Sequence, residues 1–115
     1  MNAVFSIKPQ YAQKIFEGSK WYEFRKVCCK QPIEKIYIYE TSPVCAITGE
    51  CTVNDVLQES PRVLWNLVSE NAGIPEKEYF RYFKGREKAV AYKLEHVIHY
   101  STPKKLQDFN FRTPP

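Results

Sequence analysis

The chain has 115 residues, of which 43% are hydrophobic and 26% are charged, and its formal net charge is +4. This length suits one domain spanning residues 1–115, which would bury about two-thirds of its surface on folding. No stretch approaches the roughly 18 apolar residues of a membrane span, and the N-terminus lacks a signal-peptide core, so we expect no membrane association. The mildly basic balance permits an anionic partner without requiring one.

The first quarter of the chain predicts a strand, a helix and a second strand. Residues 2–7 have the composition of a short strand, and residues 9–17 carry apolar side chains at helical spacing. Pro9 suits the first helical position, and Gly18 can take the left-handed conformation that ends a helix. From residue 21 to 27 the period changes to two, which predicts a strand.

The rest of the chain predicts three further strands and two helices. Gly49, inside one strand, indicates a bulge or a close backbone approach. The tail carries Leu106, Phe109 and Phe111 and is expected to lie across the sheet. Strands with helices between them indicate an α+β domain, and the pattern alone leaves its topology open. The expected strands cover residues 33–39, 44–53 and 88–100, and the expected helices cover residues 61–71 and 75–83.

An acid and a base stand two residues apart on the strand at residues 21–27. Glu23 and Arg25 share one strand face, about 6.5 to 7 Å apart, while Tyr22 and Phe24 share the other. Lys20 enters at the strand boundary, where its long stem can swing toward the pair. The arrangement fits either a solvent-exposed ion pair, which contributes little, or a functional site on a concave face.

These residues form the pattern Gly-x-Lys-x-x-Glu-x-Arg, which resembles the signature of the ASCH domains, relatives of the PUA-like fold. The resemblance implies a small, mostly antiparallel PUA-like β-barrel with two to three flanking helices and a cleft along the signature strand. It also implies that related chains continue slightly beyond Pro115. Three flanking segments look like the small stand-alone prokaryotic members of this family, at residues 6–9, 38–43 and 82–85.

The resemblance implies a ligand site on the signature strand, with the loop after the next strand at its rim. An ionised carboxylate only accepts hydrogen bonds, whereas lysine and arginine only donate them. Such a set can read a nucleobase edge, which presents both donors and acceptors, while an aromatic ring stacks on the base. The expected ligand-binding residues are Lys8, Lys20, Trp21, Glu23, Arg25, Tyr39, Thr41 and Ser42.

A second candidate for nucleic-acid contact lies near residues 79–88, where cations alternate with aromatic side chains. Arg81, Lys84 and Arg86 would contact phosphates, as cations do in single-strand binders. In the alternative interpretation the aromatic side chains form the core face of a helix and the cations its solvated C-terminal end.

No metal or cofactor site is expected. His96 and His99 lie three apart on a strand, so they face opposite sides and cannot share a metal. The cysteines lack the spacing of a zinc knuckle or a disulfide framework, which favours a reduced cytoplasmic protein. These cysteines are Cys28, Cys29, Cys45 and Cys51.

We therefore expect a domain that binds RNA or a modified nucleoside or nucleotide. The alternative is a small hydrolase with Lys20 and Glu23 as catalytic residues. Among proteins of this family, one group resembles an amidohydrolase that deacetylates 4-acetylcytidine, and ribonuclease activity is ascribed to others. The amidohydrolase has threonine at the position of Glu23, which counts against that activity here. A third interpretation is a structural partner module that uses the aromatic tail. The residues do not decide between binder and enzyme.

Overall fold

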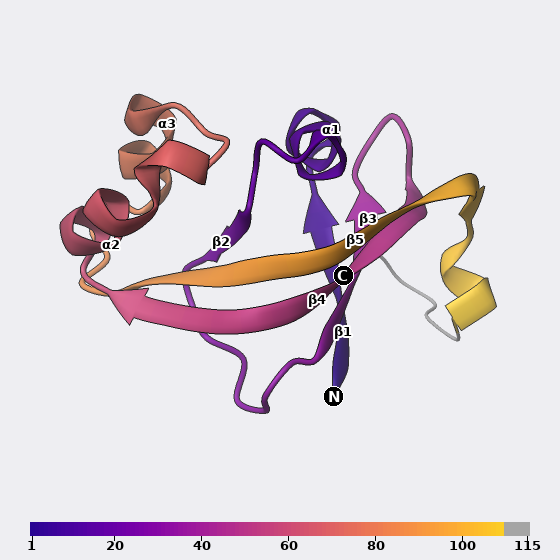
Figure 1. Ribbon diagram of the computed structural model, residues 1–115, viewed down its shortest axis with the longest axis horizontal. Coiled ribbons are helices and arrows are strands. Elements are labelled where there is room, and N and C mark those ends of the chain that lie inside the picture. The colour runs from indigo at the N-terminus through magenta and orange to yellow at the C-terminus, as the bar shows by residue number, and fades with distance from the viewer. Residues whose placement is uncertain (110–115) are drawn as a thin grey trace.

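One five-stranded sheet carries the fold, and three α-helices pack beside it (Figure 1). The computed structural model describes residues 1–109. The strands are β1 (Asn2–Ile7), β2 (Tyr22–Arg25), β3 (Lys35–Glu40), β4 (Ala46–Glu59) and β5 (Ala89–Lys104). The helices are α1 (Pro9–Glu17), α2 (Pro61–Val68) and α3 (Glu76–Tyr82), with short 3-10 turns η1 (Ser69–Asn71) and η2 (Leu106–Phe109).

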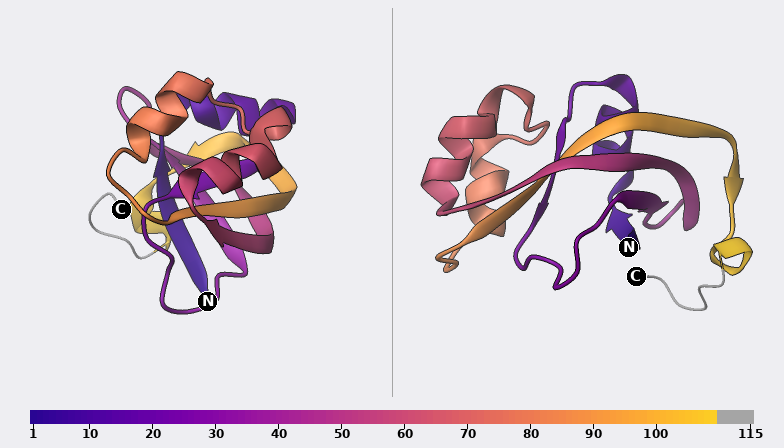
Figure 2. Two further views of the ribbon diagram at one scale, coloured as in Figure 1. Left: turned by 90° about the vertical axis from the view of Figure 1, so that its left-hand side faces the viewer. Right: turned by 60° about the horizontal axis from the view of Figure 1, so that its bottom comes forward.

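The strand order is β1-β3-β4-β5-β2, with β1 parallel to β3 and every other pair antiparallel. The ladder leaves β1 and β2 as its two edges, and the sheet curls until these edges approach one another (Figure 2). The expected α+β, mostly antiparallel, PUA-like architecture is thereby confirmed, as a curled sheet whose hydrogen-bond ladder does not close.

Gly49 sits at an irregularity in the register of β4. A Cβ added there would lie 2.4 Å from the carbonyl oxygen of Ile98 and 2.5 Å from the ring of Phe16. The predicted close approach is confirmed, because α1 rests its aromatic side chain directly on this part of the sheet. Only glycine leaves room for that contact.

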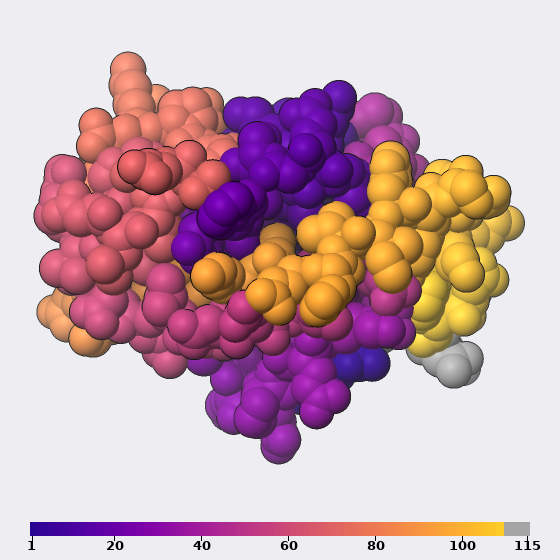
Figure 3. All heavy atoms as spheres, viewed as in Figure 1, coloured from indigo at the N-terminus to yellow at the C-terminus, as the bar shows by residue number. Residues whose placement is uncertain are grey.

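Two hydrophobic clusters form the core, and each belongs to one end of the molecule. The first lies between α1 and the sheet and contains Phe5, Ile15, Ile38 and Tyr92 among its buried members. The second packs α2 and α3 against β2 and the neighbouring end of β5, and Phe24 belongs to it. In the space-filling view the N-terminal segment, in indigo, lies between the α2–α3 end and β5 (Figure 3).

The sequence predicted the first strand and first helix at their observed bounds, since both depend on local signals. The predicted strands over residues 44–53 and 88–100 instead continue to Glu59 and Lys104, because they pair with each other along a long hairpin. In the tail, Phe109 packs against the ring of Tyr37 on β3, with centroids 4.8 Å apart. Phe111 lies outside the described residues. Among the helices of residues 1–109, none has the length and apolar character needed to cross a membrane.

Candidate functional site

A cleft of about 500 Å³ opens between α1 and α3, with β2 as its floor. We call it the motif cleft. Lys20, Glu23 and Arg25 line it from β2 and the turn before it. The opposite walls come from the β1–α1 junction and from α3. The signature residues therefore share one concavity, although they come from a turn and from alternate positions of a strand.

Lys20 reaches the cleft because helix α1 ends sharply. Gly18 takes a left-handed conformation (φ +92°), and the backbone N–H of Lys20 then donates to the carbonyl of Lys14 at 3.1 Å. The side chain is only 3% exposed, and its Nζ donates to the carbonyl of Ala72 at 2.8 Å. Nζ also lies 4.7 Å from the centroid of the Phe24 ring, where a cation is attracted to the ring face.

Burial lowers the pKa of Lys20 from 10.5 to about 8, although the nearby Glu23 carboxylate acts in the opposite direction. An ammonium in a poorly solvated site loses its hydration, and this penalty exceeds the attraction of the acid. Lys20 therefore loses its proton more readily than an exposed lysine or a lysine in a simple exposed ion pair would.

Glu23 and Arg25 form an ion pair, with Nη2 to Oε2 at 2.8 Å. Glu23 is 8% exposed, so the alternative of a solvent-exposed pair is wrong. Burial raises the pKa of the Glu23 carboxyl, while Arg25 and Lys20 partly offset that rise. As predicted, Glu23 and Arg25 both line the cleft and Phe24 is buried, but Tyr22 is only half-buried and Phe24 also contributes to the cleft lining.

Arg25 also joins the two edges of the sheet. Its Nη2 donates to the carbonyl of Ser6 on β1 at 2.9 Å, and its guanidinium lies 4.2 Å from the centroid of the Phe5 ring. One planar side chain thus contacts the acid on its own strand and the backbone of the opposite edge. This geometry suits arginine and not lysine.

Helix α3 supplies the wall that the sequence did not reveal. Tyr11 on α1 donates its hydroxyl hydrogen bond to the Glu78 carboxylate on α3, across the cleft. Burial and Glu78 raise the pKa of Tyr11 to about 12, so it stays a neutral donor. Arg81 and Tyr82 line the same wall. The spacing of Glu78, Arg81 and Tyr82 on one helix face was the only available signal, and it does not say which surface that face meets.

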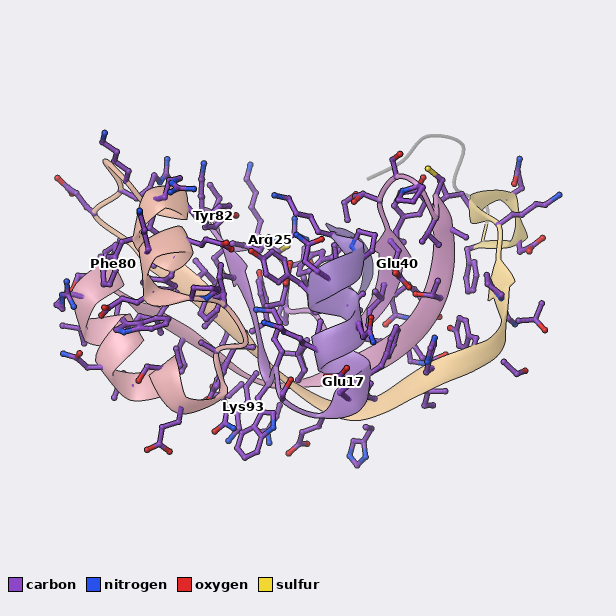
Figure 4. The ribbon with its side chains drawn as sticks, turned by 90° about the horizontal axis from the view of Figure 1, so that it is seen from above. Glu17, Arg25, Glu40, Phe80, Tyr82 and Lys93 are labelled. Atoms are coloured by element: carbon purple, nitrogen blue, oxygen red, sulfur yellow. The ribbon has the colours of Figure 1, made fainter. Side chains whose placement is uncertain are left out.

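The structure places two further predicted residues at the cleft. Lys8 lines it at the start of α1, and Arg81 lines it from α3. Arg81 was expected in a separate nucleic-acid patch, so that patch adjoins the cleft. In the side-chain view Arg25 and Tyr82 lie together between α3 and α1, while Glu17 and Lys93 lie on the opposite side of the molecule (Figure 4).

The other predicted residues lie outside the cleft lining. Trp21 is 45% exposed, and its Nε1 donates to the carbonyl of Gly18 at 2.8 Å. Tyr39 is buried beside Cys45, and Thr41 and Ser42 form the turn after β3. Two of the three cations predicted for the nucleic-acid patch, Lys84 and Arg86, are exposed after the end of α3 and do not line the cleft.

The histidines and cysteines do not gather at the motif cleft. The imidazole of His99 stacks on the ring of Phe16, with centroids 3.9 Å apart, and His96 is exposed. Within residues 1–109 no group of three or more His, Cys, Asp or Glu side chains lies close enough to hold a metal ion. The four cysteines are free thiols.

Comparison with known proteins places the chain in a family. The family model described as Domain of unknown function (DUF365) matches residues 1–111. An ASCH domain-containing ribonuclease of Zymomonas mobilis is 34% identical over 93 residues, which are 80% of this chain and 63% of that protein. A Ureaplasma parvum protein named ATP synthase subunit alpha is 34% identical over 113 residues, 97% of this chain and 14% of that protein.

The three-dimensional likeness is equally extensive. A crystal structure of a mutant of the ASCH protein from Zymomonas mobilis superposes with a TM-score of 0.87 and 32% sequence identity. The match covers 99% of this chain and 83% of that one. The chain spans between 14% and 63% of the length of the two curated relatives described above.

Fold and site together define a PUA-like α+β protein with a cleft built around a lysine, a glutamate and an arginine. The chain belongs to the ASCH domain family, and it is equally a member of the family described as Domain of unknown function (DUF365).

Proposed function

We propose that the motif cleft binds a nucleobase of RNA. The observation that carries this proposal is that the buried side chains of Lys20 and Glu23 and the half-buried side chain of Arg25 line one cleft of about 500 Å³. That volume lies in the range of about 300–1,000 Å³ typical of small-molecule sites. Glu23 offers an acceptor and Lys20 a donor, so the set can pair with the donors and acceptors of a base edge.

The composition of the cleft walls favours a ligand that is both anionic and aromatic. Tyr11 and Tyr82 present rings on which a base can stack. The cleft lining contains four cationic side chains and two carboxylates. The cations are Lys8, Lys20, Arg25 and Arg81, and the carboxylates belong to Glu23 and Glu78. The excess of positive charge favours a ligand that carries phosphate. The relative from Zymomonas mobilis is named a ribonuclease, which is consistent with RNA as the ligand class.

The proposal includes a cytoplasmic location, supported by the free cysteines.

A second candidate function is hydrolysis, of RNA or of an acylated nucleoside. Its supporting observation is the pKa of Lys20, lowered to about 8, because a neutral lysine can act as a base or a nucleophile. Arginine cannot lose its proton and cannot take either role. Lys20→Arg therefore separates the two candidates, since it retains a charged donor.

The test measures binding and turnover side by side, on the four ribonucleoside monophosphates, 4-acetylcytidine and short RNAs. For a binder, Glu23→Gln removes a charge-assisted hydrogen bond, and we expect affinity to fall about 10- to 150-fold. The matched control is Glu17→Gln, an exposed position on the opposite side of the molecule (Figure 4). Melting curves establish that each variant is folded at the assay temperature.

Binding without turnover, retained in Lys20→Arg, would support the proposal. Turnover by the wild type that disappears in Lys20→Arg while binding persists would favour the hydrolase. If Glu23→Gln and Glu17→Gln bind equally well, the motif cleft is not the binding site.

A further inference from the structure

A second cavity, of about 690 Å³, lies along the flank of α1 that faces away from α3 (Figure 4). Five residues of α1 line it, together with Glu40 of β3 and His99 of β5. Of the described residues, Gln10 alone lines both this cavity and the motif cleft. We call the second cavity the α1 groove, and its volume lies in the range of about 300–1,000 Å³ typical of small-molecule sites.

The α1 groove has a carboxylate at each end. Glu40 is the last residue of β3 and pairs with Ile7, which places it beside the start of α1. Glu17 is the last residue of α1. Nine helical residues with a rise of about 1.5 Å each separate the two ends of α1 by about 12 Å. In the side-chain view Glu17 lies at the C-terminal end of α1 and Glu40 beside its N-terminal half (Figure 4).

No cation of the protein neutralises these two carboxylates. Within residues 1–109 neither Glu17 nor Glu40 forms an ion pair, and no lysine or arginine lines the α1 groove. Glu17 also stands at the C-terminal end of its helix, where the helix dipole disfavours an anion. A positively charged ligand would relieve the repulsion at both ends of the groove.

The wall between the two ends combines amide groups with a flat apolar side. Gln10 and Gln13 are exposed on α1 and line the groove, and their amide oxygens can accept hydrogen bonds from an amine. The rings of Phe16 and His99 stack with centroids 3.9 Å apart and planes 4° apart. An alkyl chain can lie along this stacked pair while charged groups at its two ends reach the carboxylates.

We propose that the α1 groove binds a linear aliphatic polyamine. One terminal ammonium contacts Glu17, the other contacts Glu40, and the amine between them donates to a glutamine amide. The separation of the carboxylates selects the ligand by its length, because a monoamine satisfies only one end. This site goes beyond the proposed function of the motif cleft and does not depend on it.

The experiment titrates amines of increasing length and charge into five proteins by calorimetry, at pH 8 and low salt. The ligands are butylamine, 1,4-diaminobutane and spermidine. The proteins are the wild type, Glu17→Gln, Glu40→Gln, the double variant and the control Glu70→Gln. Glu70 is an exposed glutamate that lines neither cavity. Melting curves establish that each variant is folded, and NMR chemical-shift mapping in the wild type locates the bound amine independently of any substitution.

In the wild type, we expect spermidine to bind most tightly and butylamine most weakly. Glu17→Gln and Glu40→Gln should each lower spermidine affinity about 2- to 5-fold, which corresponds to the loss of one exposed ion pair. The double variant should lose about 4- to 25-fold, because the two ends are far enough apart to act independently. Glu70→Gln should bind like the wild type, and spermidine should shift the amide signals of Gln10 and Gln13.

Four results would overturn the proposal. Equal affinity for butylamine and spermidine would show that the ligand does not bridge the two ends. An effect of Glu70→Gln as large as that of either groove variant would show that amines bind the acidic surface in general. Shifts confined to residues outside the α1 groove would place the ligand elsewhere. Absence of spermidine binding to the folded wild type at low salt would remove the site altogether.

Discussion

At the scale of single residues, the site depends on two opposite charges buried side by side. Glu23 and Lys20 each lose hydration, and each is partly compensated by the other and by Arg25. Burial therefore favours the neutral form of both side chains, and the neighbouring opposite charges favour the charged forms. Sequence alone gave the identity and the spacing of these residues, but not their burial, because burial depends on α3 and on the turn at Gly73.

Lys20 makes the stability of the protein depend on pH in a defined window. Its pKa is about 8 in the folded protein and about 10.5 in the unfolded chain, so the unfolded state binds more protons between these values. The contribution of Lys20 to the free energy of unfolding therefore rises between pH 8 and pH 10.5. Below pH 8 the lysine is charged in both states, and the folded protein bears the full cost of burying that charge. Relative to Lys20→Met, we expect the wild type to gain about 3 kcal/mol across the window.

Urea unfolding of the two proteins at neutral pH and near pH 10.5 measures this gain. Titrating groups that do not interact with Lys20 contribute equally to both proteins and cancel in the difference, which leaves Lys20 and its neighbour Glu23. A difference in stability that is the same at both pH values would contradict the lowered pKa of Lys20.

At the scale of elements, the predictions succeeded where the signals are local. Helix α1 begins at Pro9 and is capped by Gly18, and the alternation of side chains after Trp21 predicted a strand where β2 lies. They fell short where distant segments meet, since nothing near Glu78 in the sequence shows that it faces Tyr11. Thr41 and Ser42 were expected at the rim of the cleft but do not line it. Residues of α3 form that wall of the cleft instead.

The turn between η1 and α3 holds Lys20 in place and offers a direct test. Gly73 has φ +67°, and a Cβ there would lie 2.4 Å from the Cβ of Lys20. Gly85 also has positive φ (+78°), but nothing lies within 4 Å of its added Cβ. We expect Gly85→Ala to cost about 1–2 kcal/mol from backbone strain alone. Gly73→Ala should cost about 1–3 kcal/mol more, because it also overpacks the site.

Thermal and urea unfolding of the two alanine variants provides the comparison. Gly73→Ala should in addition weaken ligand binding, since it displaces Lys20, whereas Gly85→Ala should not. Equal losses of stability in both variants would show that Lys20 is not packed against this turn.

At the scale of the whole molecule, the motif cleft lies at the seam of an incompletely closed sheet. The edges β1 and β2 form no backbone ladder with each other. The signature strand also lies where the two hydrophobic clusters meet, since Phe24 belongs to one cluster and Phe5, beneath Arg25, to the other. A ligand in the cleft would therefore contact both halves of the protein. The strand pattern in the sequence could not show this, because an open edge is a property of the strand order.

The last prediction concerns Arg25 as the link across the seam. Lys at this position keeps a positive charge for Glu23, but one ammonium cannot reproduce the planar contact with both Glu23 and the Ser6 carbonyl. We expect Arg25→Lys to lower the free energy of unfolding by about 1.5–3 kcal/mol, the contribution of a hydrogen bond to a charged group. The control is Arg62→Lys, whose exposed ion pair with Glu76 at 3.6 Å should contribute less than about 1 kcal/mol. Because the link joins the sheet edges, amide hydrogen exchange should accelerate in β1 and β2 more than in the centre of the β4–β5 hairpin. Uniform acceleration over all five strands would show instead that Arg25 stabilises the fold globally and that the seam has no separate opening.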